Sequence, residues 1–244
     1  MDFNYKTNFK CGEERQKYIE KTVRNGKFCE NKDGVVISKE YPKNEKNNLN
    51  SKFYKQDNFK DKKREYYIEV LKLCKNYHSF TNILEVGAGT CFFAKTYINK
   101  FKPNSYTIYD SSDVMCKRSR KKLEGKSSTN INIYNNSFKD ISAEELTKYD
   151  CVIALEVLEH INWDKEFLFS IAPETWIFFS VPRIHSFNHV RAFLTPDSIA
   201  YRYKSILDIY EIREVKRDIH FKSKHNYPIH WVVAARRGKN VIEH

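Results

Sequence analysis

Residues 81–93 of this chain read Thr-Asn-Ile-Leu-Glu-Val-Gly-Ala-Gly-Thr-Cys-Phe-Phe. The mainly apolar run at positions 83–86 is long enough for a buried strand and too short for a helix. It ends at Gly87-Ala88-Gly89, and apolar residues then recur at helical spacing from position 92 to position 98. The chain has only seven glycines in 244 residues, so two of them within three positions indicate a tight turn between a strand and a helix. In a doubly wound α/β sheet such a turn forms the first ligand site, because its glycines admit a ligand and the helix N-terminus offers N–H groups.

The turn departs from the dinucleotide-binding fingerprint Gly-x-Gly-x-x-Gly. The third glycine of that fingerprint is replaced by Phe92, whose side chain would obstruct a pyrophosphate lying over the turn. The acid Glu85, two residues before the first glycine, is also atypical of the fingerprint. The stretch Leu-Glu-Val-Gly-Ala-Gly-Thr instead resembles the first motif of class I S-adenosylmethionine-dependent methyltransferases. A turn that binds no ligand is the alternative interpretation.

Length and cysteine usage restrict the class of protein. A chain of 244 residues can hold one sizeable α/β domain and an appendage. No apolar run approaches the roughly 20 residues that span a bilayer, and the first residues do not resemble a signal peptide. The six cysteines form no Cys-x-x-Cys pair, which indicates reduced thiols and not a disulfide or zinc framework. We therefore expect a cytoplasmic protein without a membrane segment.

The formal net charge is +12. A basic surface attracts phosphate-bearing partners such as nucleic acids or nucleotide-linked substrates. Lysine and asparagine are abundant throughout, however, so a composition imposed by an AT-rich genome explains the charge equally well. The densest basic run, residues 117–122, falls in a predicted helix and is typical of a solvated face. Charge alone does not identify the partner.

The first 60 residues differ in character from the rest. They are polar and weakly periodic, with a possible short helix at 13–23, a possible hairpin at 27–38 and a loop at 42–51. We expect residues 1–60 to form a cap or lid and residues 61–244 to form the catalytic domain.

Strands and helices alternate after the glycine turn. The pattern predicts strands at 105–109, 131–134, 151–155 and 176–181, with a helix at 113–123, another from 195, and an amphipathic helix at 61–74 before the turn. Segments 211–219 and 230–235 are expected to pair as an antiparallel hairpin. This order is typical of a mostly parallel sheet. Together with the motif it predicts a Rossmann-like class I methyltransferase fold with a seven-stranded sheet.

The resemblance implies a cofactor site for S-adenosylmethionine at the carboxyl ends of the strands. Asp110 ends the second strand, where a carboxylate can accept hydrogen bonds from both ribose hydroxyls. Segment 137–138, after the third strand, would contact the adenine, although the usual acid is displaced to Asp140. An exposed acid without a ligand is the alternative for Asp110. The implied cofactor residues are Glu85, Gly87, Ala88, Gly89, Asp110, Ser111, Ser137, Phe138, Glu156 and Val157.

Residues 156–161 read Glu-Val-Leu-Glu-His-Ile after the fourth strand. This segment resembles the fourth motif of small-molecule and ubiquinone-type O-methyltransferases. The resemblance places Glu156 below the methionine part of the cofactor and directs Glu159 and His160 toward the methyl acceptor. We expect Glu159, His160 and His189 to be catalytic, with one histidine acting as general base. Plain helix capping is the alternative for His160.

The loop after the fifth strand carries Arg183, His185 and Arg191. Basic and imidazole groups close together suit an anionic or polyhydroxylated substrate, and the segment resembles the His-x-x-x-Phe-Thr region of methyltransferases from glycan and natural-product pathways. We expect these three residues to bind the acceptor. An ion pair with a carboxylate is the alternative for Arg191.

A metal site is a further possibility. Methyltransferases of the Hen1 type, which modify the 2′-oxygen at RNA 3′ ends, place a divalent ion on a Glu-x-x-Glu-His set and a later histidine. Residue by residue, that set matches Glu156, Glu159, His160 and His189. A Mg²⁺ ion on such ligands would acidify a bound hydroxyl. The aromatic-rich sequence that follows the later histidine in that family is absent here.

The sequence thus predicts transfer of a methyl group from S-adenosylmethionine to an oxygen or nitrogen of a small acceptor, anionic or sugar-like, such as a glycan precursor. One alternative is a Hen1-like, metal-dependent enzyme acting on RNA. Another is a cofactor-binding protein without activity. The oligomeric state is not predicted.

Overall fold

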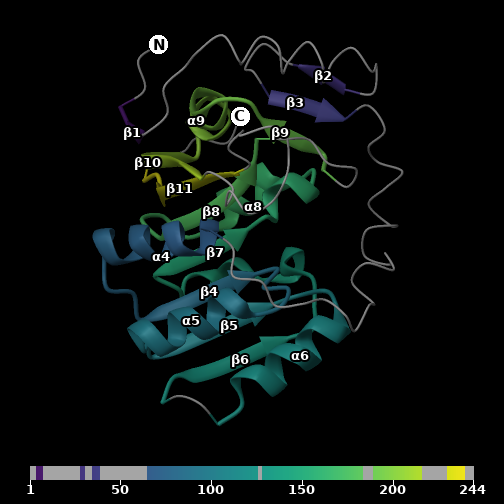
Figure 1. Ribbon diagram of the computed structural model, residues 1–244, viewed down its shortest axis with the longest axis vertical. Coiled ribbons are helices and arrows are strands. Elements are labelled where there is room, and N and C mark those ends of the chain that lie inside the picture. The colour runs from purple at the N-terminus through teal and green to yellow at the C-terminus, as the bar shows by residue number, and fades with distance from the viewer. Residues whose placement is uncertain are drawn as a thin grey trace.

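The computed structural model describes residues 4–7, 28–30, 35–38, 65–125, 128–183, 189–215 and 230–239. Eight strands form the main sheet, in the order β1-β10-β11-β8-β7-β4-β5-β6. Figure 1 shows the sheet extending from β10 near the top to β6 at the bottom, with β1 beside β10 at the upper left. The strands are β1 (Lys6–Thr7), β4 (Asn82–Val86), β5 (Ser105–Tyr109), β6 (Asn130–Tyr134), β7 (Cys151–Leu155), β8 (Trp176–Pro182), β10 (Leu207–Val215) and β11 (His230–Arg237).

Strand directions confirm the predicted architecture. β5, β6, β7 and β8 run parallel to β4, whereas β11 is antiparallel to both of its neighbours, β8 and β10. The predicted C-terminal hairpin is therefore present, but its first strand begins at Leu207 and not at position 211, and residues 216–219 lie outside the described part. Strand β1 adds an eighth strand parallel to β10, which the sequence did not predict.

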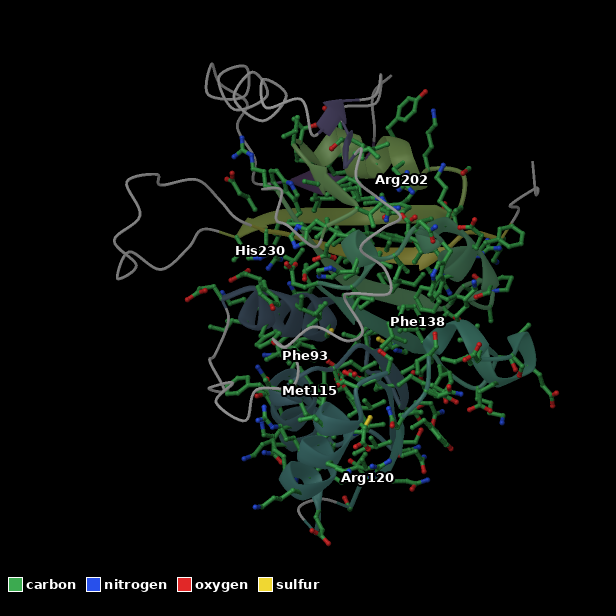
Figure 2. All side chains as sticks on the ribbon, turned by 90° about the vertical axis from the view of Figure 1, so that its right-hand side faces the viewer. Phe93, Met115, Arg120, Phe138, Arg202 and His230 are labelled. Carbon is green, nitrogen blue, oxygen red and sulfur yellow. The ribbon has the colours of Figure 1, made fainter. Side chains whose placement is uncertain are left out.

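Helices cover both faces of the sheet. Ile83 packs in a core cluster with residues of α4 and α5, whereas the next residue, Leu84, packs in a second cluster with residues of α8 and α9. Because successive side chains of a strand point to opposite faces, one strand supports both cores. Phe93 and Phe138, labelled in Figure 2, lie on these two faces. The helices are α4 (Glu65–Tyr77), α5 (Phe92–Phe101), α6 (Asp113–Leu123), α7 (Ala143–Leu146), α8 (Asp164–Ser170) and α9 (Pro196–Tyr203), with the 3-10 turns η1 (Phe138–Asp140) and η2 (Leu158–His160).

Local signals fix several helix starts. Ser112, Ser142 and Thr195 each accept a hydrogen bond from a first-turn backbone N–H, and Pro196 follows Thr195 at the first helical position.

None of the helices in the described ranges is both long and apolar enough to cross a membrane.

A second, three-stranded sheet joins the N-terminal segment to the rest of the chain. β2 (Phe28–Glu30) pairs antiparallel with β3 (Val35–Ser38), as the predicted hairpin requires, and β3 pairs antiparallel with β9 (Arg191–Phe193). The third strand, β9, was not predicted. Figure 1 shows this sheet above the end of the main sheet that carries β10 and β11. The predicted helix at 13–23 and loop at 42–51 lie outside the described residues.

Candidate active site

The glycine turn follows β4 and needs both glycines, for different reasons. Gly87 has φ +65°, and a Cβ atom there would lie 2.7 Å from Cγ2 of Val157. Gly89 has φ +53°, but a Cβ atom there would meet nothing within 4 Å. Helix α5 then begins without a side-chain cap on its first N–H groups. The turn is therefore packed against Val157 on one side, while at Gly89 the backbone faces open space that a ligand can fill.

Asp110 lies directly beside this turn. Its Oδ2 accepts a hydrogen bond from Gly89 N at 3.0 Å and its Oδ1 accepts one from Ser112 N at 2.9 Å. Burial raises the pKa of the carboxyl, which these two backbone donors partly counteract. Each oxygen keeps a second lone pair, so the carboxylate can still accept hydroxyl hydrogens. Ser111 is exposed next to it. The carboxyl ends of β4 and β5 thus meet as predicted.

Glu85 occupies a place that the sequence did not predict. Its side chain is 2 % exposed and accepts a hydrogen bond from Tyr106 Oη at 2.7 Å. Burial raises the pKa of this carboxyl to about 8, although the Tyr106 bond opposes the shift. The structure therefore corrects the expected cofactor contact, because Glu85 is a buried, protonatable group in the core beneath the turn.

The loop after β6 provides an aromatic wall. Phe138 is half-buried, and its ring centroid lies 4.8 Å from those of both Trp163 and Phe167. Ser137 caps η1 by accepting a hydrogen bond from Lys139 N at 3.2 Å. The expected acid, Asp140, is exposed.

Glu156 directly follows β7 in a strained conformation, with φ +57°. Its Oε1 accepts a hydrogen bond from Ser180 Oγ at 2.7 Å, and its Oε2 lies 3.0 Å from Nε2 of His230. Burial alone would raise the pKa of Glu156, but His230, Ser180 and the nearby His189 outweigh it and lower the pKa to about 2. The carboxylate is therefore ionised at neutral pH and already paired.

His230 is a site residue that sequence reasoning missed. It begins β11 opposite Pro182 at the end of β8, and its ring lies 4.9 Å from that of Tyr66 on α4. Figure 2 labels it at the end of its strand. The only signal was topological: a strand antiparallel to its neighbours starts where they end.

Three predicted catalytic residues form one cluster. One ligand atom from each of Glu159, His160 and His189 lies within 4.8 Å of the others. The imidazole rings meet edge to face at 4.9 Å, and His160 Nε2 lies 3.8 Å from Glu159 Oε1. Glu159 is fully buried, and within the part of the chain that the structure describes neither of its carboxyl oxygens has a hydrogen-bond partner. Burial and the neighbouring Glu156 raise the pKa of Glu159 well above its usual range.

This cluster fits a divalent cation. Buried carboxylate oxygens without partners are rare unless a ligand or ion completes them. Imidazole and carboxylate together suit several divalent metals. Glu156, the fourth predicted ligand, is not part of this cluster, and its two oxygens contact Ser180 and His230.

Comparisons with known proteins support a methyltransferase fold. Residues 84–172 match a family model described as a methyltransferase domain. The chain has the class I methyltransferase fold. Its fold is similar to that of the N-methyltransferase NodS from Bradyrhizobium japonicum WM9, in complex with S-adenosylhomocysteine, with a TM-score of 0.61 and 16% identity over 80% of this chain and 100% of that one. No curated protein sequence matches.

Two other proteins of similar fold are a small RNA methyltransferase and a plantazolicin methyltransferase. The small RNA methyltransferase HEN1 gives a TM-score of 0.58 at 15% identity, over 73% of this chain and 26% of HEN1. The plantazolicin methyltransferase BpumL gives 0.55 at 13% identity, over 82% of this chain and 92% of BpumL. Identities this low establish a shared fold and leave the acceptor open.

The predicted acceptor-binding residues do not form a basic patch. Arg183 is 6 % exposed, with Nη1 3.6 Å from Oε1 of Glu214. Arg191 is 3 % exposed, with Nη2 3.1 Å from Oδ1 of Asp164. These two placements correct the expectation, because both side chains are engaged in buried ion pairs. His185 lies outside the described residues.

Proposed function

We propose that this domain transfers a methyl group from S-adenosylmethionine to a hydroxyl oxygen of a sugar-type acceptor. The observation that carries the proposal is the Glu159, His160 and His189 cluster. It lies just beyond the β7 end, where Val157 packs against the glycine turn. A site able to remove a proton suits an alcohol acceptor, because a hydroxyl must lose its proton on methylation.

The cofactor side of the site consists of the glycine turn and the groups around it. Gly89 leaves the backbone open, Asp110 can accept ribose hydroxyl hydrogens, and Phe138 offers an aromatic surface for the adenine. When bound, the cofactor supplies a methyl group that its sulfonium already activates. The chain's own contribution is then mainly to orient the acceptor.

The proton of the acceptor would pass to His160 or His189. Imidazole is the side chain whose ordinary pKa lies closest to neutral, and a positioned base contributes about 10²–10⁴-fold to a rate. Burial raises the pKa of Glu159 beside them, and in its protonated form this carboxyl can donate one hydrogen bond.

The same three side chains would hold a divalent cation such as Mg²⁺, which would lower the pKa of a hydroxyl next to it. Cation and simple base are alternative ways to use one cluster. Sensitivity to chelators separates them, because a base needs no cation.

A small, sugar-like acceptor in the cytoplasm remains our first proposal for the substrate. The idea that the acceptor is anionic loses its main support, because Arg183 and Arg191 are buried in ion pairs. Methylation of a ribose hydroxyl in RNA is the second candidate. The cluster's metal-ligand chemistry and the net charge of +12 favour it.

Transfer of a labelled methyl group tests the proposal. The protein is incubated with methyl-labelled S-adenosylmethionine and either a panel of monosaccharides and nucleotide sugars or a single-stranded RNA, with and without chelator. We expect label in a hydroxyl-bearing acceptor, and a loss of at least tenfold in His189→Asn. The exposed histidine variant His78→Asn is the control and should keep full activity. Label on an amine, or full activity in His189→Asn, would contradict the proposal.

A further inference from the structure

The turn that carries two of the three cluster residues has little support of its own. η2 spans only Leu158–His160, and its N-cap residue, Val157, makes no side-chain cap hydrogen bond. A backbone hydrogen bond runs from His160 N to Val157 O at 2.9 Å. A turn this short is a weak frame for a catalytic pair, because 3-10 geometry gives poor hydrogen bonds. The positions of Glu159 and His160 must therefore be fixed by contacts from outside the turn.

Residues 190 and 191 provide those contacts. Arg191 Nη1 donates hydrogen bonds to Leu158 O and, at 2.7 Å, to Ile161 O, so the guanidinium holds the carbonyls on both sides of the Glu159–His160 pair. Val190 N donates to Glu159 O at 2.6 Å. Three carbonyls around the turn are thus bound by two adjacent residues.

The other side of the Arg191 guanidinium is fixed by Asp164. This carboxylate is fully buried, and it also accepts hydrogen bonds from Arg202 Nε and Nη2, both at 2.7 Å, and from Tyr203 Oη at 2.7 Å. Figure 2 labels Arg202 on α9, which packs over this region. A planar guanidinium held at both ends has little freedom, so its two carbonyl bonds set the orientation of η2.

The segment that leads into β9 supplies the third cluster residue. His189 lies two positions before Arg191, so residues 189–191 provide one imidazole directly and hold the turn that provides the other. β9 is in turn paired with β3 of the N-terminal segment, where Ile37 lies opposite Arg191.

We propose that Arg191 is a positioning residue, which sets the separation between the Glu159–His160 pair and His189, and that β3 supports it by holding β9. The predicted effect of Arg191 on the reaction rate rests on the proposed function. Its predicted effect on the geometry of the cluster does not. A role in stabilising the fold would also explain the burial of Arg191. The test must therefore distinguish an effect on the positions of the cluster residues from an effect on the stability of the protein.

Arg202 offers a matched control. It pairs with the same carboxylate as Arg191, and none of its hydrogen bonds that the structure records reaches a carbonyl of η2. Arg191→Met, Arg191→Lys and Arg202→Met are compared with the wild-type protein by proton NMR of the histidine Cε1–H signals, assigned with His160→Asn and His189→Asn. Because the two rings meet edge to face at 4.9 Å, their signals report their mutual position through ring currents.

We expect both Arg191 variants to shift the His160 and His189 signals. Arg202→Met should leave these signals unchanged, even if it lowers the melting temperature as much as the Arg191 variants do. Lysine should not restore the signals, because one ammonium cannot take the places of both Nη1, which binds the carbonyls, and Nη2, which faces Asp164. Affinity for S-adenosylhomocysteine should stay near the wild-type value in all variants that fold, and kcat should fall on the order of 10²-fold in the Arg191 variants.

Unchanged histidine signals in Arg191→Lys, or equal shifts in Arg202→Met, would overturn the inference. If no acceptor is methylated, the NMR comparison still decides whether Arg191 positions the two histidines. Failure of this inference and failure of the proposed function can therefore be distinguished.

Discussion

Glu85 makes the stability of this protein depend on pH in a way that one substitution should remove. Burial raises the pKa of its carboxyl from 4.5 to about 8. A group whose pKa is raised on folding contributes stability at low pH, and that contribution is lost as pH rises from the unfolded value through the folded one. With 1.36 kcal/mol per unit, the loss between about pH 5.5 and about pH 8.5 is about 3 kcal/mol.

Glu85→Gln keeps the shape and an acceptor for the Tyr106 hydroxyl, and has no proton to lose. Its absolute stability also reflects the two amide hydrogens, so the quantity to compare is the pH dependence. Denaturant unfolding is measured at several pH values. Across that range, the free energy of unfolding of the variant should rise relative to that of the wild type by about 3 kcal/mol. Glu124→Gln removes an exposed carboxylate at the end of α6. Its free energy of unfolding should depend on pH in the same way as that of the wild type, so that the two curves are parallel. Parallel curves for Glu85→Gln would refute the argument that this carboxyl is buried beneath the turn.

Three further predictions follow from packing and charge. Gly87→Ala should destabilise the fold by more than Gly89→Ala in thermal melts, because strain of roughly 1–3 kcal/mol applies at both positions but only the first also meets Val157 at 2.7 Å. Asp164→Asn removes the carboxylate that two buried arginines share, so denaturant titration should show a loss of about 3–5 kcal/mol. His189→Asn should weaken Co²⁺ binding, followed by visible absorption, by at least about tenfold if the cluster holds a cation; an unchanged titration would remove the cation from the account.

The architecture could be predicted because its signals are local. The glycine turn, the β-rich runs that follow and the capping residues Ser112, Ser142 and Thr195 are each read within a few positions of sequence. Their order then restricts the sheet topology to a small set of choices. The position of Asp110 beside the glycine turn could be predicted for the same reason, since it follows a strand next to that turn.

The polar groups around the site were harder to predict, because their roles depend on partners far away in the sequence. Arg191 looks like a substrate-binding residue until Asp164 and the η2 carbonyls are seen to surround it. Glu156 looks like a metal ligand until His230, 74 positions later, is found at 3.0 Å. The pairing of β9 with β3 likewise has no local signal, because both strands are short and their partners are distant.

Binding of S-adenosylhomocysteine tests the central claim most directly. Isothermal calorimetry on the wild-type protein should show one site with micromolar affinity. Asp110→Ala should weaken binding by about ten- to hundred-fold, because loss of a charge-assisted contact costs roughly 1.5–3 kcal/mol. Asp110→Asn serves as a second variant if alanine impairs folding, and Asp113→Ala, which removes an exposed acid paired with Lys117, should bind as the wild type does. If the folded wild-type protein shows no heat of binding, the glycine turn and Asp110 are not a cofactor site, and the proposed methyl transfer is contradicted.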